Sequence, residues 1–222
     1  MATVLVVAPH PDDETIGCGG TLLRHVAAGD EVHWLIVTAF TEADGIPLQA
    51  IAARRNEIAL AGEAYGFRQT HALDLPETRI DAMPMVELVR QVGAVVRAVA
   101  PAILYLPYRG DAHSDHRVVF DAAAACTKWF RYPTVRQVLA YETLSETDAG
   151  LNPDRNGFQP NVFFDISGQL EKKMQIMDIY ASEMAPPPFP RSALAIRSLA
   201  VVRGASCGSA AAEAFMLLRE IR

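Results

Sequence analysis

The stretch Val4-Leu5-Val6-Val7-Ala8-Pro9-His10-Pro11-Asp12-Asp13-Glu14 decides how this chain is interpreted. An apolar run ends in a proline, and an imidazole and three consecutive carboxylates follow. A short apolar run bounded by a turn-forming residue is typical of a buried strand. Side chains of the metal-ligand type therefore stand where a buried strand is expected to emerge from the core.

A second polar cluster, His113-Ser114-Asp115-His116, follows another apolar run, Ile103-Leu104-Tyr105-Leu106-Pro107. Catalytic zinc sites commonly use three protein ligands and leave one position for water. His10 and Asp13 can turn toward one point if a helical turn follows Pro11, and His116 completes a site of two histidines and one carboxylate. The two clusters together predict a metal-dependent hydrolase.

Apolar runs alternate along the chain with segments of helical periodicity. This alternation predicts an α/β fold, a Rossmann-like, doubly wound and mostly parallel sheet with helices on both faces. The runs are continuously apolar, as expected for strands that are covered on both sides. The predicted strands are Val4–Ala8, Val32–Val37, Ala72–Leu75 and Ile103–Leu106, and the predicted helices are Gly20–Ala28, Leu48–Tyr65, Met85–Val99 and Val118–Phe130.

In a doubly wound sheet with strand order 3-2-1-4, the first and fourth strands are neighbours, and ligands bind beyond their carboxyl ends. Both polar clusters follow these two strands, so we expect them to meet in one crevice. After Pro133 the pattern is weaker. It predicts strands at Val138–Tyr141 and Val162–Ile166, a helix over Ser167–Ala181, a long loop over Thr147–Pro160, and helical segments after Arg191.

Composition limits the possible functions. The 222 residues are half apolar and carry a formal net charge of -6, which predicts one domain over residues 1–222 and no nucleic-acid partner. The longest apolar stretch, Val92–Leu106, contains Arg97 and Pro101, so we expect no membrane span, no signal peptide and a cytoplasmic protein. Three widely spaced cysteines fit a reducing compartment.

The sequence does not match the motifs of other nucleotide-binding or hydrolytic sites. The segment Gly17-Cys18-Gly19-Gly20-Thr21-Leu22 places a leucine at the third glycine position of a dinucleotide-binding loop, so its glycines are better explained by close helix packing. Cys18 lies near enough to His10 in sequence to be considered as a ligand, but a small apolar residue at a helix start is the commoner case. Phosphate-loop and nucleophile-elbow motifs are missing from the sequence, which leaves a metal-activated water as the simplest nucleophile.

The remaining side chains of the clusters have expected catalytic roles. Because Asp13 is the partner of His10 at i, i+3, we expect Asp12 to act as general base on the water. His113 stands one helical turn before His116, where as an imidazolium it would stabilise the oxyanion and protonate the leaving amine. Asp115 is expected to orient a histidine ring. Either cluster alone could be explained by helix capping or by exposed helix residues, but both together favour the site.

The two motifs together resemble the PIG-L/LmbE-like N-acetylglucosaminyl deacetylases. The similarity extends over nearly the whole chain, because further segments also resemble bacterial members: Arg54-Arg55-Asn56-Glu57, Thr78-Arg79-Ile80-Asp81, Gln159-Pro160-Asn161, Pro190-Arg191-Ser192 and Ala212-Glu213-Ala214-Phe215. The resemblance implies one zinc ion per chain on His10, Asp13 and His116, Asp12 as base and His113 as electrophilic acid. It also implies hydrolysis of the N-acetyl group of an amino sugar, typically an N-acetylglucosamine derivative, to acetate and a free amine.

The resemblance further implies that an arginine and an aspartate contact the sugar hydroxyls. These roles map most simply onto Arg54 and Asp81, with Arg55 as an alternative. Arg54 could instead form an ion pair with Glu57, and Asp81 could cap the helix that follows. Arg191 would close over the ligand or anchor its loop.

The chain departs from the family at Phe189, where related sequences often have histidine, after Pro186-Pro187-Pro188. An aromatic ring there would stack on the substrate or pack the loop, which puts the leaving-group side in doubt. The 41–50 and 147–160 loops are expected to form the pocket that selects the substrate. Homo-oligomer formation is an expectation from the family resemblance alone.

Three other functions fit parts of the pattern. An amidase for a non-sugar N-acylated molecule would use identical machinery. A non-catalytic sugar-binding module would need neither Asp12 nor His113, and a phosphoesterase would be expected to have a flanking basic cluster. Fe(II), Co(II) or Mn(II) would also fit two histidines and one carboxylate.

Overall fold

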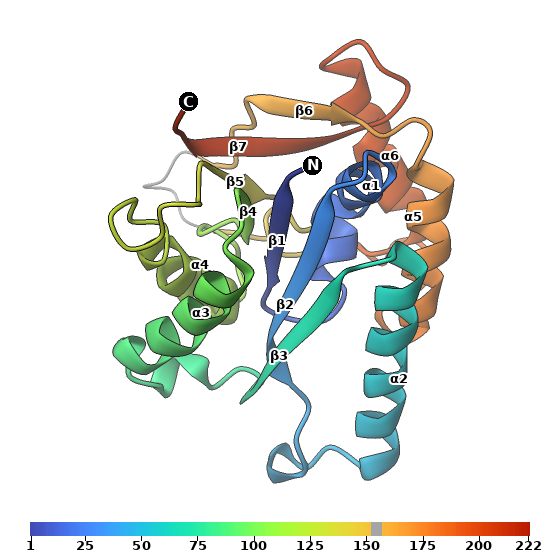
Figure 1. Ribbon diagram of the computed structural model, residues 1–222. Coiled ribbons are helices and arrows are strands. Elements are labelled where there is room, and N and C mark those ends of the chain that lie inside the picture. Colours follow the sequence, from blue (N-terminus) through green and yellow to red (C-terminus); the bar gives the residue numbers. More distant parts are fainter. Residues whose placement is uncertain (152–156) are drawn as a thin grey trace.

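A computed structural model describes residues 1–151 and 157–222. Its sheet has the strand order β3-β2-β1-β4-β5-β7-β6, and β1 to β5 are parallel whereas β7 is antiparallel to both of its neighbours (Figure 1). The strands are β1 Thr3–Ala8, β2 Glu31–Ala39, β3 Gln69–Pro76, β4 Ile103–Pro107, β5 Gln137–Tyr141, β6 Val162–Asp165 and β7 Ala212–Glu220. The predicted α/β class and the adjacency of β1 and β4 are confirmed.

The helices cover both faces of this sheet. They are α1 Asp13–Ala27, α2 Leu48–Tyr65, α3 Met85–Val99, α4 Ser114–Ala125, α5 Leu170–Met177 and α6 Ala193–Ala205, with 3-10 segments η1 Glu42–Asp44, η2 Ile80–Ala82 and η3 Asp178–Glu183. Helices α3 and α4 lie on one face, and α1, α2, α5 and α6 lie on the other (Figure 1). In the described ranges, no helix is long and apolar enough to cross a membrane.

Each strand of the sheet centre sends alternate side chains to the two faces. In β1, Val4 and Val6 pack in the core beneath α1, whereas Leu5 and Val7 pack beneath α3 and α4. All four side chains are fully buried. Burying large apolar residues on both faces contributes roughly 1.5–3 kcal/mol for each side chain, which stabilises the strands whose ends carry the loops.

Several predicted boundaries are wrong. Helix α1 begins at Asp13, not Gly20, and is kinked at Cys18, where φ is -144°. The predicted helix Val118–Phe130 begins earlier and ends at Ala125, and the predicted helix Ser167–Ala181 is split into α5 and η3. Helix ends are where sequence patterns carry least information, because capping and packing decide them.

The largest correction concerns β7. Helical segments were expected after Arg191, and α6 is one, but Ala212–Glu220 forms a strand between β5 and β6. Part of the predicted 147–160 loop, residues 152–156, lies outside the described residues. The glycines of α1 pack closely as predicted: a Cβ at Gly17 would lie 2.8 Å from the carbonyl oxygen of Glu142.

Candidate metal centre

The first cluster lies in the turn between β1 and α1. Asp12 precedes the helix with φ 120° and ψ -29°, a left-handed conformation that is costly for a residue with a Cβ. The turn is held by its own hydrogen bonds: the amide of His10 donates to Asp13 Oδ2 at 2.9 Å, and the amide of Asp12 donates to Glu14 Oε2 at 3.1 Å. Strained backbone of this kind is found where side chains must be held in one place for function.

The predicted metal ligands come together at the carboxyl ends of β1 and β4. His10 Nδ1 lies 3.2 Å from Asp13 Oδ2, and His116 Nε2 lies 3.3 Å from the same oxygen. One ligand atom from each of the three residues lies within 4.8 Å of the others. His10, Asp13 and His116 therefore form a candidate site of two histidines and one carboxylate, as the sequence predicted. Cys18 packs in the core instead of joining this group.

Two atoms of this group have no hydrogen-bond partner although they are buried. They are Asp13 Oδ1 and His116 Nε2. Leaving a buried polar atom unsatisfied costs about 1–3 kcal/mol, so such atoms call for an explanation. Imidazole nitrogen and carboxylate oxygen are ligands that zinc accepts, and a cation at this point would satisfy both atoms. The residues present thus fit a divalent metal ion.

The electrostatics of the ligands point the same way. Burial opposes a positive charge on His116, yet the carboxylates of Asp13 and Asp111 raise the pKa of His116 to about 9. Burial likewise opposes ionisation of Asp13, but the imidazoles of His116 and His10 hold the pKa of Asp13 well below its usual value. The cluster stabilises positive charge at its centre, which a metal ion would supply.

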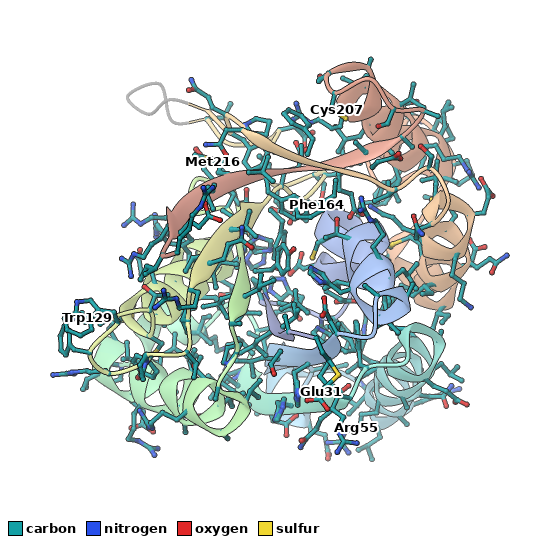
Figure 2. The ribbon with its side chains drawn as sticks, turned by 45° about the horizontal axis from the view of Figure 1, so that its top comes forward. Glu31, Arg55, Trp129, Phe164, Cys207 and Met216 are labelled. Atoms are coloured by element: carbon teal, nitrogen blue, oxygen red, sulfur yellow. The ribbon has the colours of Figure 1, made fainter. Side chains whose placement is uncertain are left out.

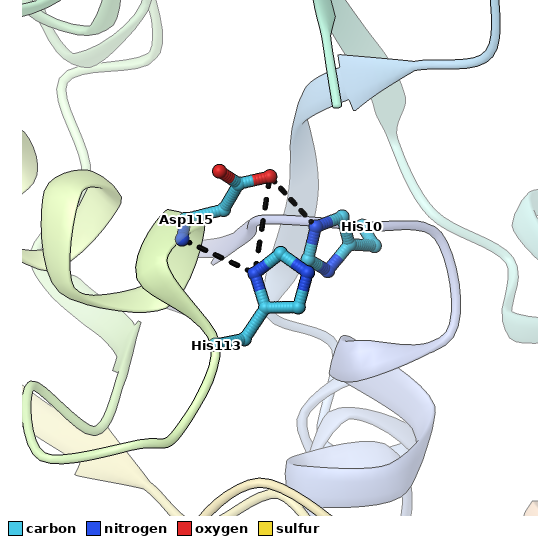
Figure 3. Close-up of side chains that lie close together, drawn as sticks. All are labelled: His10, His113 and Asp115. Atoms are coloured by element: carbon cyan, nitrogen blue, oxygen red, sulfur yellow. Dashed lines mark hydrogen bonds and ion pairs between the residues drawn. The ribbon is translucent and has the colours of Figure 1, made fainter. Parts of the chain in front are cut away.

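Two carboxylates orient the histidine ligands. Asp111 Oδ2 lies 2.7 Å from His116 Nδ1, and Asp111 Oδ1 accepts a hydrogen bond of 2.6 Å from Thr147 Oγ1. Asp115 Oδ2 lies 3.1 Å from His10 Nε2, as Figure 3 shows. Such carboxylate partners fix the ring orientation and tautomer of a metal-binding histidine. Asp115 thus lies where an orienting residue was expected, and Asp111 was missed.

His113 borders both the metal ligands and the pocket. Its Nδ1 accepts a hydrogen bond of 3.1 Å from the amide of Asp115 and lies 3.9 Å from Asp115 Oδ2 (Figure 3). Burial and the neighbouring charge of His10 lower the pKa of His113. With Nδ1 acting as acceptor, the neutral ring carries its proton on Nε2, where it can serve as a donor. His10, His113 and Asp115 also form a second possible ligand group. In that group, His10 Nε2 already pairs with Asp115 Oδ2 and His113 Nδ1 accepts from the amide of Asp115, whereas the first group contains a buried histidine nitrogen without a hydrogen-bond partner, His116 Nε2, so we favour the first group as the metal site.

Asp12, the predicted base, is buried and faces Arg191. Arg191 Nη1 donates to Asp12 Oδ2 at 2.9 Å. Burial and the adjacent charge of Asp13 raise the pKa of Asp12, and the guanidinium of Arg191 acts in the opposite direction. The side chain of Arg191 is further held by Ser145 Oγ at 2.9 Å and Glu146 Oε1 at 3.3 Å. Arg191 therefore contacts Asp12, the predicted base, and is tied to the 143–147 turn.

A pocket of about 100 Å³ opens beside Asp12 and His113. Its wall also contains His10, Pro11, Phe40, Arg54, Glu77, Glu183 and Arg191. Arg54 is buried, its guanidinium lies 5.0 Å from the ring centre of Phe40, and it forms ion pairs with Glu183 and with Glu57 at 3.3 Å. Arg54 therefore forms the predicted ion pair with Glu57 and also lines the pocket, and its contact with a substrate stays a prediction.

Of the other residues considered as substrate contacts, Arg191 lines this pocket, whereas Arg55, Asp81 and Phe189 are not among its lining residues. Arg55 is exposed on the outer surface of α2 (Figure 2). Asp81 is exposed in η2, and it does not cap α3, because the residue before that helix is Pro84. Phe189 is 42% exposed and is not among the described residues that line the pocket.

Sequence reasoning missed Phe40, Glu77, Glu183 and Asp111. Phe40 and Glu77 directly follow β2 and β3, so the rule that predicted the two clusters could have reached them as well. Glu183 lies at the end of η3, in a segment with no pattern that points to a site.

Glu14 is buried beneath the metal ligands. Its Oε1 accepts hydrogen bonds from Thr15 Oγ1 at 2.6 Å and Tyr180 Oη at 3.1 Å, and Tyr65 Oη in turn donates to Thr15 Oγ1 at 2.9 Å. Burial raises the pKa of Glu14 to about 7. This network joins the first turn of α1 to α2 and η3.

A further buried ion pair holds the middle of α1. Lys173 Nζ lies 2.7 Å from Glu213 Oε1 and donates to the carbonyl of Ile16 at 2.9 Å. Glu213 also accepts the amide hydrogens of Gly20 at 2.9 Å and Thr21 at 2.7 Å. These bonds satisfy the amides that the kink at Cys18 releases from the helix.

The fold and the site define a class: Rossmann-like α/β proteins with a candidate metal centre of two histidines and one carboxylate at the carboxyl ends of β1 and β4. Within that class, the chain belongs to the PIG-L family. The model of that family, described as GlcNAc-PI de-N-acetylase, matches residues 5–127. The family resemblance of the two motifs is confirmed.

Individual relatives agree with this assignment. The chain is 30% identical over 226 residues to the diacetylchitobiose deacetylase of Thermococcus kodakarensis, covering 95% of this chain and 80% of the relative. The conserved protein TT1542 from Thermus thermophilus superimposes with a TM-score of 0.80 at 25% identity, covering 100% of this chain and 97% of that one.

The same fold also serves another reaction. The 4-carboxy-2-hydroxymuconate hydratase of Pseudomonas putida has a TM-score of 0.75 at 19% identity, with 100% of this chain and 98% of that chain covered. The fold alone therefore does not determine the chemistry, which must be argued from the site.

Proposed function

We propose that this protein is a zinc-dependent hydrolase that removes the N-acetyl group from an amino sugar, an N-acetylglucosamine derivative. The observation that carries the proposal is the pair of unsatisfied buried atoms, Asp13 Oδ1 and His116 Nε2, beside a pocket that also contains Asp12 and His113. Membership of a deacetylase family and the similarity to a diacetylchitobiose deacetylase support the substrate class.

His10, Asp13 and His116 would hold the metal ion. When bound, a divalent metal supplies a Lewis acid at this point and makes the attacking water more acidic. Asp111 and Asp115 keep the two histidine rings in the orientation that presents a nitrogen to the centre.

Asp12 acts as the general base. Its carboxylate accepts a proton from the water that attacks the amide carbon. Arg191 Nη1, 2.9 Å from Asp12 Oδ2, orients this carboxylate and opposes the rise in its pKa that burial and Asp13 cause. His113 donates its Nε2 hydrogen to the amide oxygen as negative charge develops there. The C–N bond then breaks, the nitrogen takes the proton held by Asp12, and acetate and a free amine leave.

Arg54, Glu77 and Glu183 line the rest of the pocket and are suited to bind sugar hydroxyls. Arg191 is also suited to bind a sugar hydroxyl, since it lines the pocket and contacts Asp12. Asp81 stays a prediction as a substrate contact, and from its exposed position it would reach only the outer part of a ligand.

The test measures acetate and free-amine release from N-acetylglucosamine derivatives with the metal stripped and restored. Asp12→Asn is expected to lower kcat by about 10²–10⁴-fold, while bound metal measured by mass spectrometry stays at one ion per chain. Glu31→Gln, which removes an exposed carboxylate from the start of β2, serves as the matched control. Unchanged turnover in Asp12→Asn would refute the mechanism, and release that needs no metal would refute the hydrolase.

A further inference from the structure

The 143–147 turn, which follows β5, is closed by its own hydrogen bonds. The amides of Glu146 and Thr147 donate to the carbonyl oxygen of Thr143 at 3.1 and 2.8 Å, and Thr147 Oγ1 accepts the amide hydrogen of Thr143 at 2.8 Å. Ser145, at the tip of the turn, has φ 77°, in the left-handed region that is costly for a residue with a Cβ. Backbone in this region is kept where the surrounding contacts require it.

One set of contacts leads from this turn to a metal ligand. Thr147 Oγ1 donates to Asp111 Oδ1 at 2.6 Å, and Asp111 Oδ2 lies 2.7 Å from His116 Nδ1. A hydroxyl has a single hydrogen to donate. Because Thr147 Oγ1 accepts from the amide of Thr143, that hydrogen is directed at Asp111. We call this series, Thr147, Asp111 and His116, the ligand-side network.

A second set of contacts leads from the same turn to the predicted base. Ser145 Oγ accepts from Arg191 Nε at 2.9 Å, and Glu146 Oε1 accepts from Nη2 at 3.3 Å. Since a guanidinium is planar, holding Nε and Nη2 also fixes the direction of Nη1. Arg191 Nη1 donates to Asp12 Oδ2 at 2.9 Å and lies 3.4 Å from Glu183 Oε2. We call this series, Ser145, Glu146, Arg191 and Asp12, the base-side network.

The backbone ties the turn to the loop that carries Asp111. The amide of Ala112, the next residue, donates to the carbonyl oxygen of Glu146 at 2.9 Å. Just beyond the turn, a Cβ at Gly150 would lie 2.8 Å from the carbonyl oxygen of Gly110, so the two segments approach each other more closely than a side chain would allow. These backbone contacts would hold the two segments together even if the side chains of Ser145 and Thr147 were apolar.

The side-chain contacts therefore need a further explanation. Asp12 belongs to the β1–α1 turn and His116 to α4, and the 143–147 turn reaches both through polar side chains. A metal-bound water can be deprotonated only if the base lies at the right distance from the metal, and a displacement of about 1 Å can cost on the order of 10²-fold in rate. One turn that contacts both networks can keep that distance constant.

From these contacts we infer that the 143–147 turn is a positioning element that sets the metal ligand His116 and the base Asp12 together. Thr147 acts on the ligand through Asp111, and the tip of the turn acts on the base through Arg191. The inference rests on the proposed function, because it requires a metal ion at His116 and a base at Asp12.

The ligand-side network is tested by metal affinity, which needs no turnover. Thr147→Val removes the donor to Asp111 at nearly constant volume, and zinc affinity in competition with a chelator should fall about tenfold. Thr147→Ser keeps the hydroxyl and should bind zinc as the wild type does. Thr134→Val, at an exposed threonine before β5, is the matched control.

The base-side network is tested by kcat at saturating zinc. Ser145→Ala combined with Glu146→Ala removes both acceptors that the turn offers to Arg191, and kcat should fall about tenfold with KM and zinc affinity unchanged. Ser206→Ala combined with Glu220→Ala changes the same residue types at exposed positions and is the control. A turn that served the fold alone would lower Tm in these variants and leave the kcat and zinc affinity of the folded protein as in the wild type.

Two results would overturn the inference. They are a zinc affinity that is unchanged in Thr147→Val or equally low in Thr147→Val and Thr147→Ser, and a wild-type kcat in the combined Ser145 and Glu146 variant. If the wild type hydrolyses none of the sugars, that result counts against the proposed function alone. The zinc affinities of Thr147→Val and Thr147→Ser then still decide whether the turn positions the ligand.

Discussion

Two buried clusters of charge contact helix α1, one at its start and one at its middle. In the Lys173–Glu213 cluster, both carboxylate oxygens of Glu213 have donors and the ammonium of Lys173 has two acceptors. In the candidate metal centre, by contrast, Asp13 Oδ1 and His116 Nε2 are buried without a hydrogen-bond partner. The two clusters are built from similar side chains on the same helix, but only the second has atoms left over to bind something else.

The difference separates a structural ion pair from a binding site. A closed cluster stabilises the fold only while both partners are present, because a lone buried charge is costly. An open cluster is destabilising by itself and gains stability from what binds there. The two clusters should therefore respond in opposite ways to substitution and to metal.

Breaking the closed cluster should have the largest effect on stability. Lys173→Met leaves Glu213 buried without its cation and is expected to lower the free energy of unfolding by about 3–5 kcal/mol, measured by urea denaturation. Arg197→Met removes the exposed ion pair with Glu171 and should leave the free energy of unfolding nearly unchanged. Equal decreases in unfolding free energy in the two variants would show that the buried Lys173–Glu213 pair stabilises the fold no more than an exposed ion pair does.

Glu14 lies between the two clusters and should make stability depend on pH. Its pKa is about 7 in the folded protein and 4.5 when free, so the unfolded state loses its proton first. This contribution to stability is complete below pH 4.5 and falls as pH rises to about 7, by about 3 kcal/mol in total. In metal-free protein, Glu14→Gln should remove that fall between pH 4.5 and 7, whereas Glu31→Gln should keep it. Parallel curves of unfolding free energy against pH for wild type and Glu14→Gln would contradict the prediction.

Metal should stabilise the protein through the open cluster alone. Zinc at about 100 times its dissociation constant is expected to raise the unfolding free energy by about 2.7 kcal/mol, seen as a higher Tm. His116→Ala should abolish the increment, and Lys173→Met should retain it. An increment that survives in His116→Ala would place the metal elsewhere.

The smallest expected effect comes from the orientation of one ligand. Asp111→Asn keeps an acceptor for His116 but removes its charge, and metal affinity should fall about 10–100-fold in competition with a chelator. Asp121→Asn, on the same helix as His116 and paired with Arg109 at 2.5 Å, is the matched control. Equal affinity in both variants would show that Asp111 does not act on the ligand.

The metal ligands could be predicted because parallel strands bring their carboxyl ends to one edge. That rule needs only strand order, so it placed His10 and Asp13 beside His116. It could not supply Glu183 or the contact between Arg191 and Asp12, because both come from segments whose conformation depends on packing against the finished sheet.

Strand β7 illustrates a second limit. Ala212-Glu213-Ala214-Phe215-Met216-Leu217-Leu218 is rich in residues that favour helices, and the chain nevertheless forms a strand there. Tertiary contacts outweigh the helix preference of this segment. β7 forms backbone hydrogen bonds with both β5 and β6, and its Glu213 pairs with the buried ammonium of Lys173. The sequence of residues 212–218 alone does not indicate these contacts, because the partners lie far away in the chain.

The position of β7 also sets the order in which the molecule can be completed during synthesis. β7 pairs with β5 on one side and β6 on the other, and it is translated after both. Until it emerges from the ribosome, β5 and β6 have no common neighbour, and the amides of Gly20 and Thr21 lack the carboxylate of Glu213. The side chains that would hold the metal are all made by residue 116, yet the middle of the helix that begins at Asp13 must wait for nearly a hundred further residues before Glu213 can bind its amides.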